Sequence, residues 1–306
     1  MVKEKRRFKF TRSKLTPYLL LLPWFVGIAA FRLYPILVSV WYSLHDVTLL
    51  GGQGLQAEWV GLNNFYALLF RGGPTTTHFW TSVRATLFYV ILGTPAVLIT
   101  AFFVAFILNF KLKGVNLFRT AYYIPSILGG NVAVAIIWRE VFAGHGPVNA
   151  VLGIFGVEPF SWLNHSIFAP ITLVFLSAWQ FGSVMLIFLA ALQNVSPSLY
   201  EAASIDGAKK WRQLFSITLP IITPVLLFNT VNVLIRHFQA FNEGFLITRR
   251  GPMGATEFLN IMIYDFAFLR LQFGMASAIT LLLLFAIGIL TLILFFSSKY
   301  WVHYSD

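Results

Sequence analysis

A row of polar residues stands at helical spacing in an otherwise apolar part of the chain that begins near Pro220. Its members are 3, 4, 3 and 4 positions apart, which places them on one helical face, and they are Asn229, Asn232, Arg236, Gln239 and Glu243. His237 lies at the edge of that face. Ionisable groups inside membrane helices are costly and usually face a bundle interior or a water-filled cavity. The row is therefore predicted either to line the path of a polar solute or to form a hydrogen-bonded seam with a neighbouring helix.

Three further polar or aromatic residues are candidates for the same path. Trp179 and Gln180 lie together in another apolar stretch, where an indole face could stack on a sugar ring and an amide could bond its hydroxyls. Simple core packing is the alternative interpretation of Trp179. Asn131 follows Pro125 and the pair Gly129-Gly130, where irregular backbone could open a cavity.

The sequence contains none of the short motifs that would make it an enzyme. A nucleotide-binding GxxxxGK[ST] is absent, as are HExxH and GxSxG. The histidines are scattered, with no pair four positions apart, and there is no cysteine, so no metal site and no cofactor are predicted. An intramembrane enzyme would have only Glu243, His237 and Asp265 as loosely placed candidates. A chain that uses ATP energy would have to obtain it from another subunit.

The composition indicates a membrane protein built from helices. Hydrophobic residues make up 58% of the 306 residues and charged residues 11%, against roughly 45–50% and about 25% in soluble proteins. Only helices satisfy backbone hydrogen bonds in lipid at these lengths, and a span needs roughly 20 apolar residues. We therefore predict an all-α polytopic protein of about six spans, located at 15–42, 85–110, 120–138, within 166–192, at 220–248 and within 271–298.

The distribution of lysine and arginine predicts the orientation of these spans. With the N-terminus inside, 14 basic residues lie in inside segments and six in outside segments, while Arg32 and Arg236 lie within spans. This bias favours both termini in the cytoplasm. The predicted organisation is a basic cytoplasmic N-terminus at 1–14, a transmembrane domain at 15–298 with a cytoplasmic loop at 193–220, and a cytoplasmic tail at 299–306. The connections at 43–84, 139–165 and 249–270 are expected to be partly ordered external caps.

The cytoplasmic loop between the fourth and fifth spans carries the clearest local pattern. Ser198 and Glu201 have the spacing of a capping box, so a helix is expected to begin there. Gly207 stands where this short helix would end, since glycine tolerates positive φ. Beyond it, Trp211, Leu214 and Phe215 form one apolar stripe. The pattern predicts a helix, a break and a second helix, which either rest on lipid headgroups or contact another protein.

The residues of this loop resemble the EAA loop of the membrane subunits of binding-protein-dependent ABC importers. Residues at the family spacing are Glu201, Ala202, Ala203, Asp206, Gly207, Ala208, Phe215, Ile217, Leu219 and Pro220. Segments 118–130 and 264–278 are similar to parts of the carbohydrate branch of that family. Residues 19–35 resemble the first span of the subunit type related to the larger maltose-permease subunit, in a shorter form. The family often has a Gly-Gly-Pro turn where this chain has Arg249-Arg250-Gly251-Pro252.

This resemblance implies a non-catalytic permease subunit in a bacterial or archaeal cytoplasmic membrane, importing a sugar or oligosaccharide. Its implied partners are a second homologous permease subunit, a dimer of ATPase subunits that bind ATP and Mg²⁺, and an extracytoplasmic solute-binding protein. Glu201, Ala202, Ala203, Asp206, Gly207 and Phe215 would couple it to the ATPase. The sugar-contacting positions of the maltose permease fall at Val233, Arg236, His237 and Ala240.

Two interpretations outside this assignment remain open from the residues themselves. A secondary transporter or channel for a polar solute would also have six spans and a polar stripe. The charge of the solute is open as well: an unpaired Arg236 favours an anionic solute, whereas an Arg236 paired within the bundle favours a neutral one.

Overall fold

The computed structural model describes residues 12–50, 54–110, 114–129 and 132–303, and these are mostly helical. Four helical stretches are long and apolar enough to cross a membrane: Tyr18–Ser43, Gly73–Leu108, Lys210–Phe238 and Phe273–Trp301. Two bent helix pairs bring the number of candidate spans to as many as six. The fold class predicted from the sequence, a polytopic helical membrane protein, is thereby confirmed. The basic residues at 1–11 and Asn131 lie outside the described residues.

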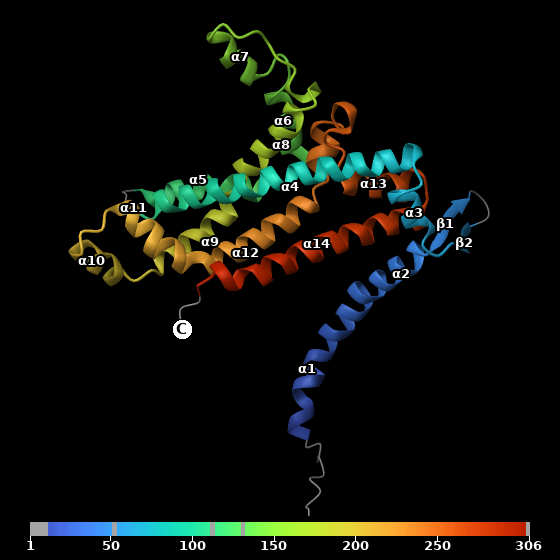
Figure 1. Cartoon of the computed structure of the whole chain (residues 1–306), viewed down its shortest axis with the longest axis horizontal. Helices are drawn as coiled ribbons and strands as arrows, with labels where there is room; N and C mark the ends of the chain where they lie inside the picture. The colour runs from blue at the N-terminus through green and yellow to red at the C-terminus, as the bar shows by residue number, and fades with distance from the viewer. Residues whose placement is uncertain (1–11, 51–53, 111–113, 130–131, 304–306) are drawn as a thin grey trace, which may run out of the picture.

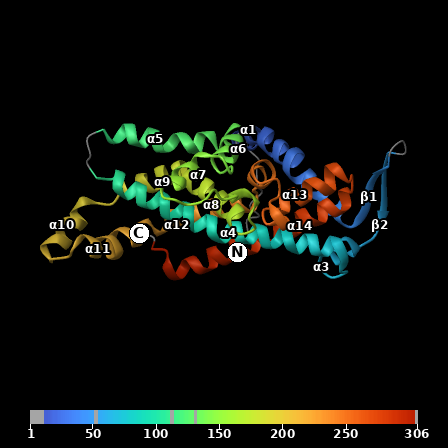
Figure 2. The ribbon, with the colours of Figure 1, turned by 90° about the horizontal axis from the view of Figure 1, so that it is seen from above.

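The long helix α4 (Gly73–Leu108) is the axis of the bundle. Against it pack α8 (Phe168–Trp179), α9 (Gly182–Gln193) and α12 (Leu219–Phe238), while α14 (Phe273–Trp301) packs against α12. Seen from above, α5 (Val115–Leu128) and α14 lie at opposite edges of the bundle (Figure 2). The helix α4 begins twelve positions before the predicted second span, because its first three turns extend beyond the apolar segment among the external loops.

Two of the spans are broken helices. The third consists of α5 and α6 (Val132–Val141), which meet at 103° on either side of residues 130–131. The fourth consists of α8 and α9, which meet at 45° around Gln180 and Phe181. At this second bend Gly182 touches α5 so closely that an added Cβ would lie 2.5 Å from the carbonyl oxygen of Tyr122. Only glycine permits this approach between the third and fourth spans.

The fifth span is shorter than predicted. Helix α12 ends at Phe238, residues 239–241 leave the helix, and the π-helix η4 occupies Glu243–Ile247. The amide of Asn260, in helix α13 (Leu259–Tyr264), donates to the carbonyl oxygens of Phe238 at 3.1 Å and Ala240 at 3.3 Å. These bonds satisfy carbonyls that the broken helix leaves unpaired. The prediction of one uninterrupted polar face from Asn229 to Glu243 was therefore wrong beyond Gln239.

One end of the bundle carries a small hairpin that the sequence reading missed. Strands β1 (His45–Leu50) and β2 (Gly54–Trp59) pair antiparallel, with His45 opposite Trp59. Helix α3 (Asn63–Leu69) follows, and the amide of its Asn64 donates to the carbonyls of Ser43 and His45 at 2.9 and 3.0 Å. The 3₁₀ helix η5 (Pro252–Gly254) and the π-helix η6 (Asp265–Leu269) belong to the same end.

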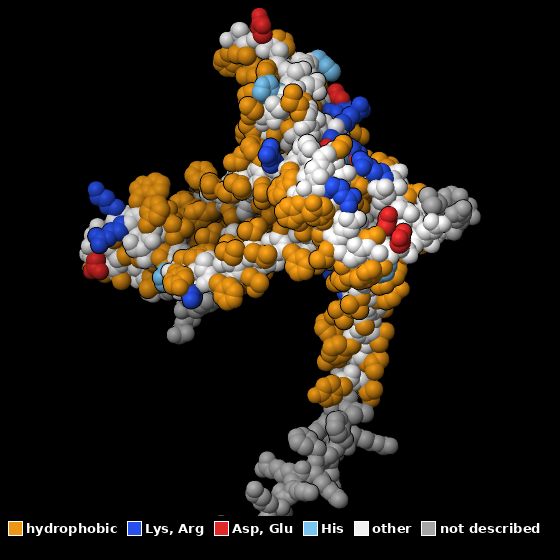
Figure 3. Space-filling view, turned by 45° about the vertical axis from the view of Figure 1, so that its right-hand side comes forward, with side chains coloured by type: hydrophobic (Ala, Val, Ile, Leu, Met, Phe, Trp, Pro, Cys, Tyr) orange, Lys and Arg blue, Asp and Glu red, His pale blue; other side chains and the backbone are white. Residues whose placement is uncertain are grey.

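The opposite end carries the predicted loop between the fourth and fifth spans. Helices α10 (Pro197–Ile205) and α11 (Lys210–Gln213) lead into the π-helix η3 (Leu214–Thr218) and then α12. The chain end at residue 303 lies near this end of the bundle (Figure 1). Apolar side chains cover the sides of the molecule, and charged side chains gather toward its ends (Figure 3). This distribution is that of a protein whose sides face lipid.

The first part of the first helical stretch stands apart from the bundle. The stretch runs through α1 (Arg12–Ile28), the π-helix η1 (Ala29–Leu33) and α2 (Tyr34–Ser43), and α2 packs against α14 and β1. Between Tyr18 and Leu37 no side chain is buried, and α1 projects away from the remaining helices (Figure 1).

Between α6 and α8 the chain leaves the side of the bundle. The short helix α7 (Pro147–Ile154) and the 3₁₀ helix η2 (Trp162–Asn164) form this separate segment. Buried Asn149 holds it together: its amide donates to the carbonyl of Phe160 at 2.8 Å and its oxygen accepts from the indole of Trp162 at 2.9 Å.

Candidate functional site

The broken ends of three spans surround a polar cavity of about 340 Å³, here called the inner cavity. Helix α5 contributes Ser126, and the bend between α8 and α9 contributes Gln180. Its remaining polar lining comes from the end of α12 and the segment that follows: Arg236, Gln239, Asn242 and Glu243. Of the residues predicted to line a solute path, the structure brings together Gln180, Arg236, Gln239 and Glu243. The helix break after Gln239 turns Glu243 toward the same cavity.

Arg236 provides the positive charge of the inner cavity. Its side chain is exposed, and no ion pair of Arg236 occurs among the residues that the structure describes. Glu243 is half-buried and lies in the first turn of η4. A guanidinium, a carboxylate and three carboxamides together offer both donors and acceptors to a polar solute.

The other members of the polar row point elsewhere. Asn229 is buried, and exposed Asn232 donates to the carbonyl of Phe228 at 2.7 Å within its own helix. His237 is buried against α4: its Nδ1 lies 2.9 Å from the hydroxyl of Thr94, and its ring meets Tyr89 edge to face. The row is thus divided between a seam with α4 and a cavity face. The predicted pathway roles of Asn232 and His237 find no support in this geometry, because neither is among the residues lining the inner cavity.

Trp179 lies just outside the inner cavity, in contact with another indole. Its ring centre is 5.8 Å from that of Trp138 on α6, and its side chain is partly exposed. Trp138 in turn donates to the carbonyl of Thr172 at 3.1 Å. This pair closes the space between α6 and α8, which agrees with the packing interpretation of Trp179. Asn131 lies outside the described residues, so its predicted place in the path stays a prediction.

The predicted loop has the expected helix, break and helix. Gly207, at φ of +76°, separates α10 from α11. The buried amide of Gln213 donates to the Ser204 hydroxyl at 2.9 Å and the Ala208 carbonyl at 3.1 Å, which fixes the two helices together. The predicted start was wrong by two positions, since the N-cap is Ser196 and Pro197 occupies the first turn. Proline suits that position because its missing N–H would be unpaired there in any case.

The outer face of this loop is open. Glu201, Ala202, Asp206 and Gly207 are exposed, and Ala203 is half-buried. Trp211 and Phe215 are 72% and 62% exposed with their rings stacked, whereas Leu214 is buried against the bundle. The predicted apolar stripe is therefore divided, with Leu214 in the core and two large aromatic rings left outside. Large exposed aromatic rings are typical of protein contacts.

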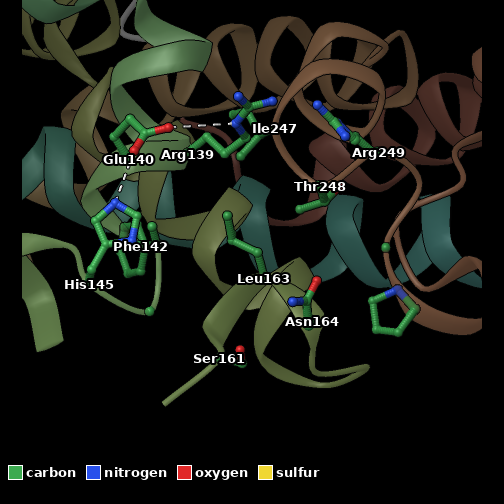
Figure 4. Close-up of a pocket in the computed structure, with 14 residues that line it drawn as sticks. Arg139, Glu140, Phe142, His145, Ser161, Leu163, Asn164, Ile247, Thr248 and Arg249 are labelled. Atoms are coloured by element: carbon green, nitrogen blue, oxygen red, sulfur yellow. Dashed lines mark ion pairs between the residues drawn. The ribbon is translucent and has the colours of Figure 1, made fainter. Parts of the chain in front are cut away.

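A second cavity, beside the segment that contains α7 and η2, was not predicted from the sequence. It measures about 610 Å³ and lies between the end of α6, the η2 segment and the segment at 247–252 (Figure 4). Its charged lining residues are Arg139, Glu140 and Arg249, and His145 lies beside Glu140. We call it the outer cavity. In the sequence, Arg249 and Arg250 carry no local pattern that indicates a cavity.

Next to the outer cavity, a chain of ion pairs fixes the segment at 249–258. The guanidinium of Arg250 forms two hydrogen bonds with the carboxylate of Asp265 and lies 3.3 Å from Glu257, which also meets His78 Nε2 at 2.7 Å. The hydrogen bond with Asp265 raises the pKa of Arg250. Burial alone would raise the pKa of Glu257, but the contacts with His78 and Arg250 outweigh it and hold that pKa below its ordinary value.

Comparison with known proteins places this architecture in one family. The family model for the binding-protein-dependent transport system inner membrane component matches residues 82–305. The chain is 39% identical over 305 residues to the probable ABC transporter permease protein YesP of Bacillus subtilis (strain 168), covering 99% of this chain and 96% of that protein. It is 30% identical over 302 residues to the lactose transport system permease protein LacF of Rhizobium radiobacter, covering 94% and 98%.

The fold is also that of a solved transporter chain. A chain in the crystal structure of the bacterial alginate ABC transporter, in complex with an alginate pentasaccharide-bound periplasmic protein, superposes with a TM-score of 0.80. The match covers 96% of this chain and 98% of that chain at 19% sequence identity. At that identity the likeness concerns the fold alone.

Proposed function

The chain belongs to the family of binding-protein-dependent transport system inner membrane components, and from that premise we propose that it forms half of the import path for a sugar or oligosaccharide. A solute-binding protein delivers this solute, and ATP hydrolysis by separate subunits drives its passage. The permease itself is not catalytic and changes no bond of the solute. It works by exposing a polar cavity alternately to the two sides of the membrane.

The observation that carries this proposal is the inner cavity. Its polar groups lie where three spans are broken, at the ends of α5, α8 and α12. Broken helices are the usual way for a membrane protein to place polar groups and free backbone within the bilayer, because irregular backbone is tolerated there only where it lines a cavity. Gln180 and Gln239 offer hydroxyl-binding amides, and Arg236 offers an unpaired cation. Lactose and alginate in the names of similar transporters support a saccharide.

The second proposed element is the coupling loop at 193–220. Its exposed residues Glu201, Ala202, Asp206, Gly207 and Phe215 would dock on the ATPase subunit, with half-buried Ala203 between them. Because Gln213 and η3 join the loop rigidly to α12, a displacement of the docked loop would be transmitted to the helix that carries Arg236. Closure of the ATPase dimer on ATP would then rock the bundle about the inner cavity.

We further propose a second, homologous permease subunit as the partner that covers the open side. The side chains between Tyr18 and Leu37 are uncovered, and α5 presents exposed Ile124 and Ile127. Two ATPase subunits and both termini on the cytoplasmic side complete the proposed assembly. The loop at 193–220 and the end of α14 lie at the same end of the bundle, which agrees with that topology.

The coupling role is tested by reversing the charge of Glu201. In importer reconstituted with its binding protein, Glu201→Lys should abolish solute-stimulated ATP hydrolysis while the membrane content of the protein stays normal. Glu58→Lys is the matched control, because Glu58 is an equally exposed carboxylate on the hairpin at the other end. Normal stimulation in Glu201→Lys would remove the coupling assignment.

The solute path is tested at Arg236. If Arg236 contacts an anionic solute, Arg236→Gln should lower uptake of an acidic oligosaccharide far more than uptake of a neutral one of equal length. An equal loss for both, together with a lower amount of protein in the membrane, would mean that Arg236 has a structural role.

A further inference from the structure

The outer and inner cavities are linked through shared lining residues. Ile247 lines both the outer cavity and a constriction of only about 10 Å³. That constriction is also lined by Gln180, Asn242 and Glu243, which belong to the inner cavity as well. The π-helix η4, from Glu243 to Ile247, thus has one end at each cavity. A solute that moves from the outer cavity to Arg236 would pass buried Ile247.

The charges around the outer cavity are mainly positive. Arg139 and Arg249 approach it from opposite walls, one at the end of α6 and one after η4 (Figure 4). Glu140 is the single carboxylate among the lining residues, 4.0 Å from the Arg139 Nε atom and 3.5 Å from His145 Nε2. Its side chain is half exposed, so this contact neutralises Arg139 only weakly. The cavity therefore attracts anions.

The backbone conformation at Arg249 and Arg250 is unfavourable, which indicates a function for each of the two side chains. Their φ angles are +49° and +75°, in the left-handed region where a residue other than glycine costs free energy. Arg250 has a visible use, since it pairs with Asp265 and Glu257. The amide of Arg250 also donates to the Gly244 carbonyl at 2.7 Å. Arg250 thus anchors the segment, and its neighbour Arg249 is held at the cavity.

Arg249 has no ion pair among the residues that the structure describes. A position with left-handed backbone is here filled by an exposed guanidinium. Backbone strain of this kind persists at ligand-binding positions when the surroundings over-determine it.

We propose that the outer cavity is an entry subsite for an anionic solute, with its carboxylate or phosphate group held between Arg139 and Arg249 before it passes Ile247. This inference rests on the proposed import function. Guanidinium groups bind carboxylate and phosphate oxygens through paired hydrogen bonds. The volume of about 610 Å³ accommodates a few sugar rings. With Arg236 beyond the constriction, the path has positive charge on both sides of its narrowest point.

Transport of a matched pair of solutes tests the subsite. The reconstituted importer is given an alginate trisaccharide or its neutral methyl ester, and initial uptake is measured at limiting concentration. Arg139→Gln and Arg249→Gln should each lower uptake of the acidic form about tenfold and that of the ester less than twofold, since a lost charge-assisted bond is worth about 1.5–3 kcal/mol and 1.4 kcal/mol is tenfold. Arg270→Gln is the control, because exposed Arg270 lines neither cavity. Unchanged ratios, or equal losses for both solutes, would overturn the subsite.

A second measurement does not depend on which solute the importer accepts. The chain has no cysteine, so Asn164→Cys in the outer cavity wall provides a single thiol. A sulfonate-bearing thiosulfonate should label it faster than an ammonium-bearing one, and Arg249→Gln should lower that preference several-fold. An unchanged preference would contradict the inference.

Protection of the same thiol distinguishes a carboxylate of the solute from a carboxylate of the binding protein. Slower labelling with the alginate trisaccharide, but not with its ester, supports a solute subsite. Protection only by solute-free binding protein would assign the arginines to docking of that protein and overturn the proposal. Wild-type importer that transports no saccharide would refute the proposed function instead, and the labelling preference would still decide the charge of the cavity.

Discussion

Replacing Asp265 with asparagine should loosen the segment at 249–258 without unfolding the bundle. The Asp265 side chain is only 6% exposed and Arg250 is 33% exposed. Asparagine keeps one acceptor oxygen for the guanidinium but loses the charge. The loss of one charge-assisted hydrogen bond from a partly exposed pair corresponds to about 2 kcal/mol. If the free energy of local opening falls by this amount, the population of the open state rises about 30-fold.

Hydrogen exchange reports this opening directly. Three amide hydrogens are held by the anchored segment: Arg250 donates to Gly244 at 2.7 Å, Gly251 to Thr248 at 2.8 Å, and Thr256 to Arg250 at 3.1 Å. Their exchange should accelerate about 30-fold in Asp265→Asn, while amides in the middle of α4 exchange as before. Asp46→Asn, at an exposed carboxylate of the hairpin, is the control. Unaltered exchange in the 244–258 peptides of Asp265→Asn would show that the ion pair does not hold the segment.

Three other expectations concern single side chains. The pKa of Glu257 lies below its ordinary value, so its stabilising contribution is present above the ordinary carboxyl pKa of about 4.3 and is lost as the pH falls through the lowered value. The difference in Tm between wild type and Glu257→Gln should therefore disappear on acidification. A difference that does not depend on pH would contradict this. Gly182→Ala should cost about 1–3 kcal/mol, because its Cβ would lie 2.5 Å from the Tyr122 carbonyl oxygen; lower Tm and lower transport are expected, and wild-type behaviour would mean that α5 moves freely. Thr94→Val should cost about 1–2 kcal/mol in detergent melts, because it leaves buried His237 without its hydroxyl partner; an unchanged Tm would show that this bond contributes nothing.

Much of the membrane architecture follows from composition. Apolar length predicted about six spans, and the structure has four candidate spans, or six if each bent helix pair is one span. The two helices of the loop at 193–220 were predictable for a similar reason: Gly207 and the helix-forming residues around it are local signals. Local signals suffice where the structure is decided within a few residues of the chain.

The inner cavity depends on a break that has no local signal. No proline or glycine stands between Phe238 and Asn242, so helical periodicity was extended through them. The break is stabilised by Asn260, whose amide bonds the carbonyls of Phe238 and Ala240 from about twenty positions away. A contact of that separation cannot be read from spacing, and in an unbroken helix Glu243 would lie about 10 Å of rise beyond Arg236 on the same face.

The fates of Asn232, His237 and Arg236 show the same limit. All three lie within five positions in the sequence, and all are polar. His237 packs against α4 and contacts the Thr94 hydroxyl, so it does not line the inner cavity, whereas Arg236 one position earlier does. One residue step along a helix separates these directions by about 100°, and only the position of the neighbouring helices says which direction is the cavity.

The separate first helix bears on how the cell would handle this subunit. A stretch of twenty residues with no buried side chain adds nothing to the cohesion of the remaining bundle. On the proposed assembly, its apolar surface is covered only when the partner subunit is made. A subunit synthesised in excess would then expose the uncovered apolar surface of this helix to membrane proteases and insertion chaperones. Balanced synthesis of the two permeases would follow from removal of orphan chains, without any dedicated regulator, and a subunit expressed alone should have the shorter lifetime.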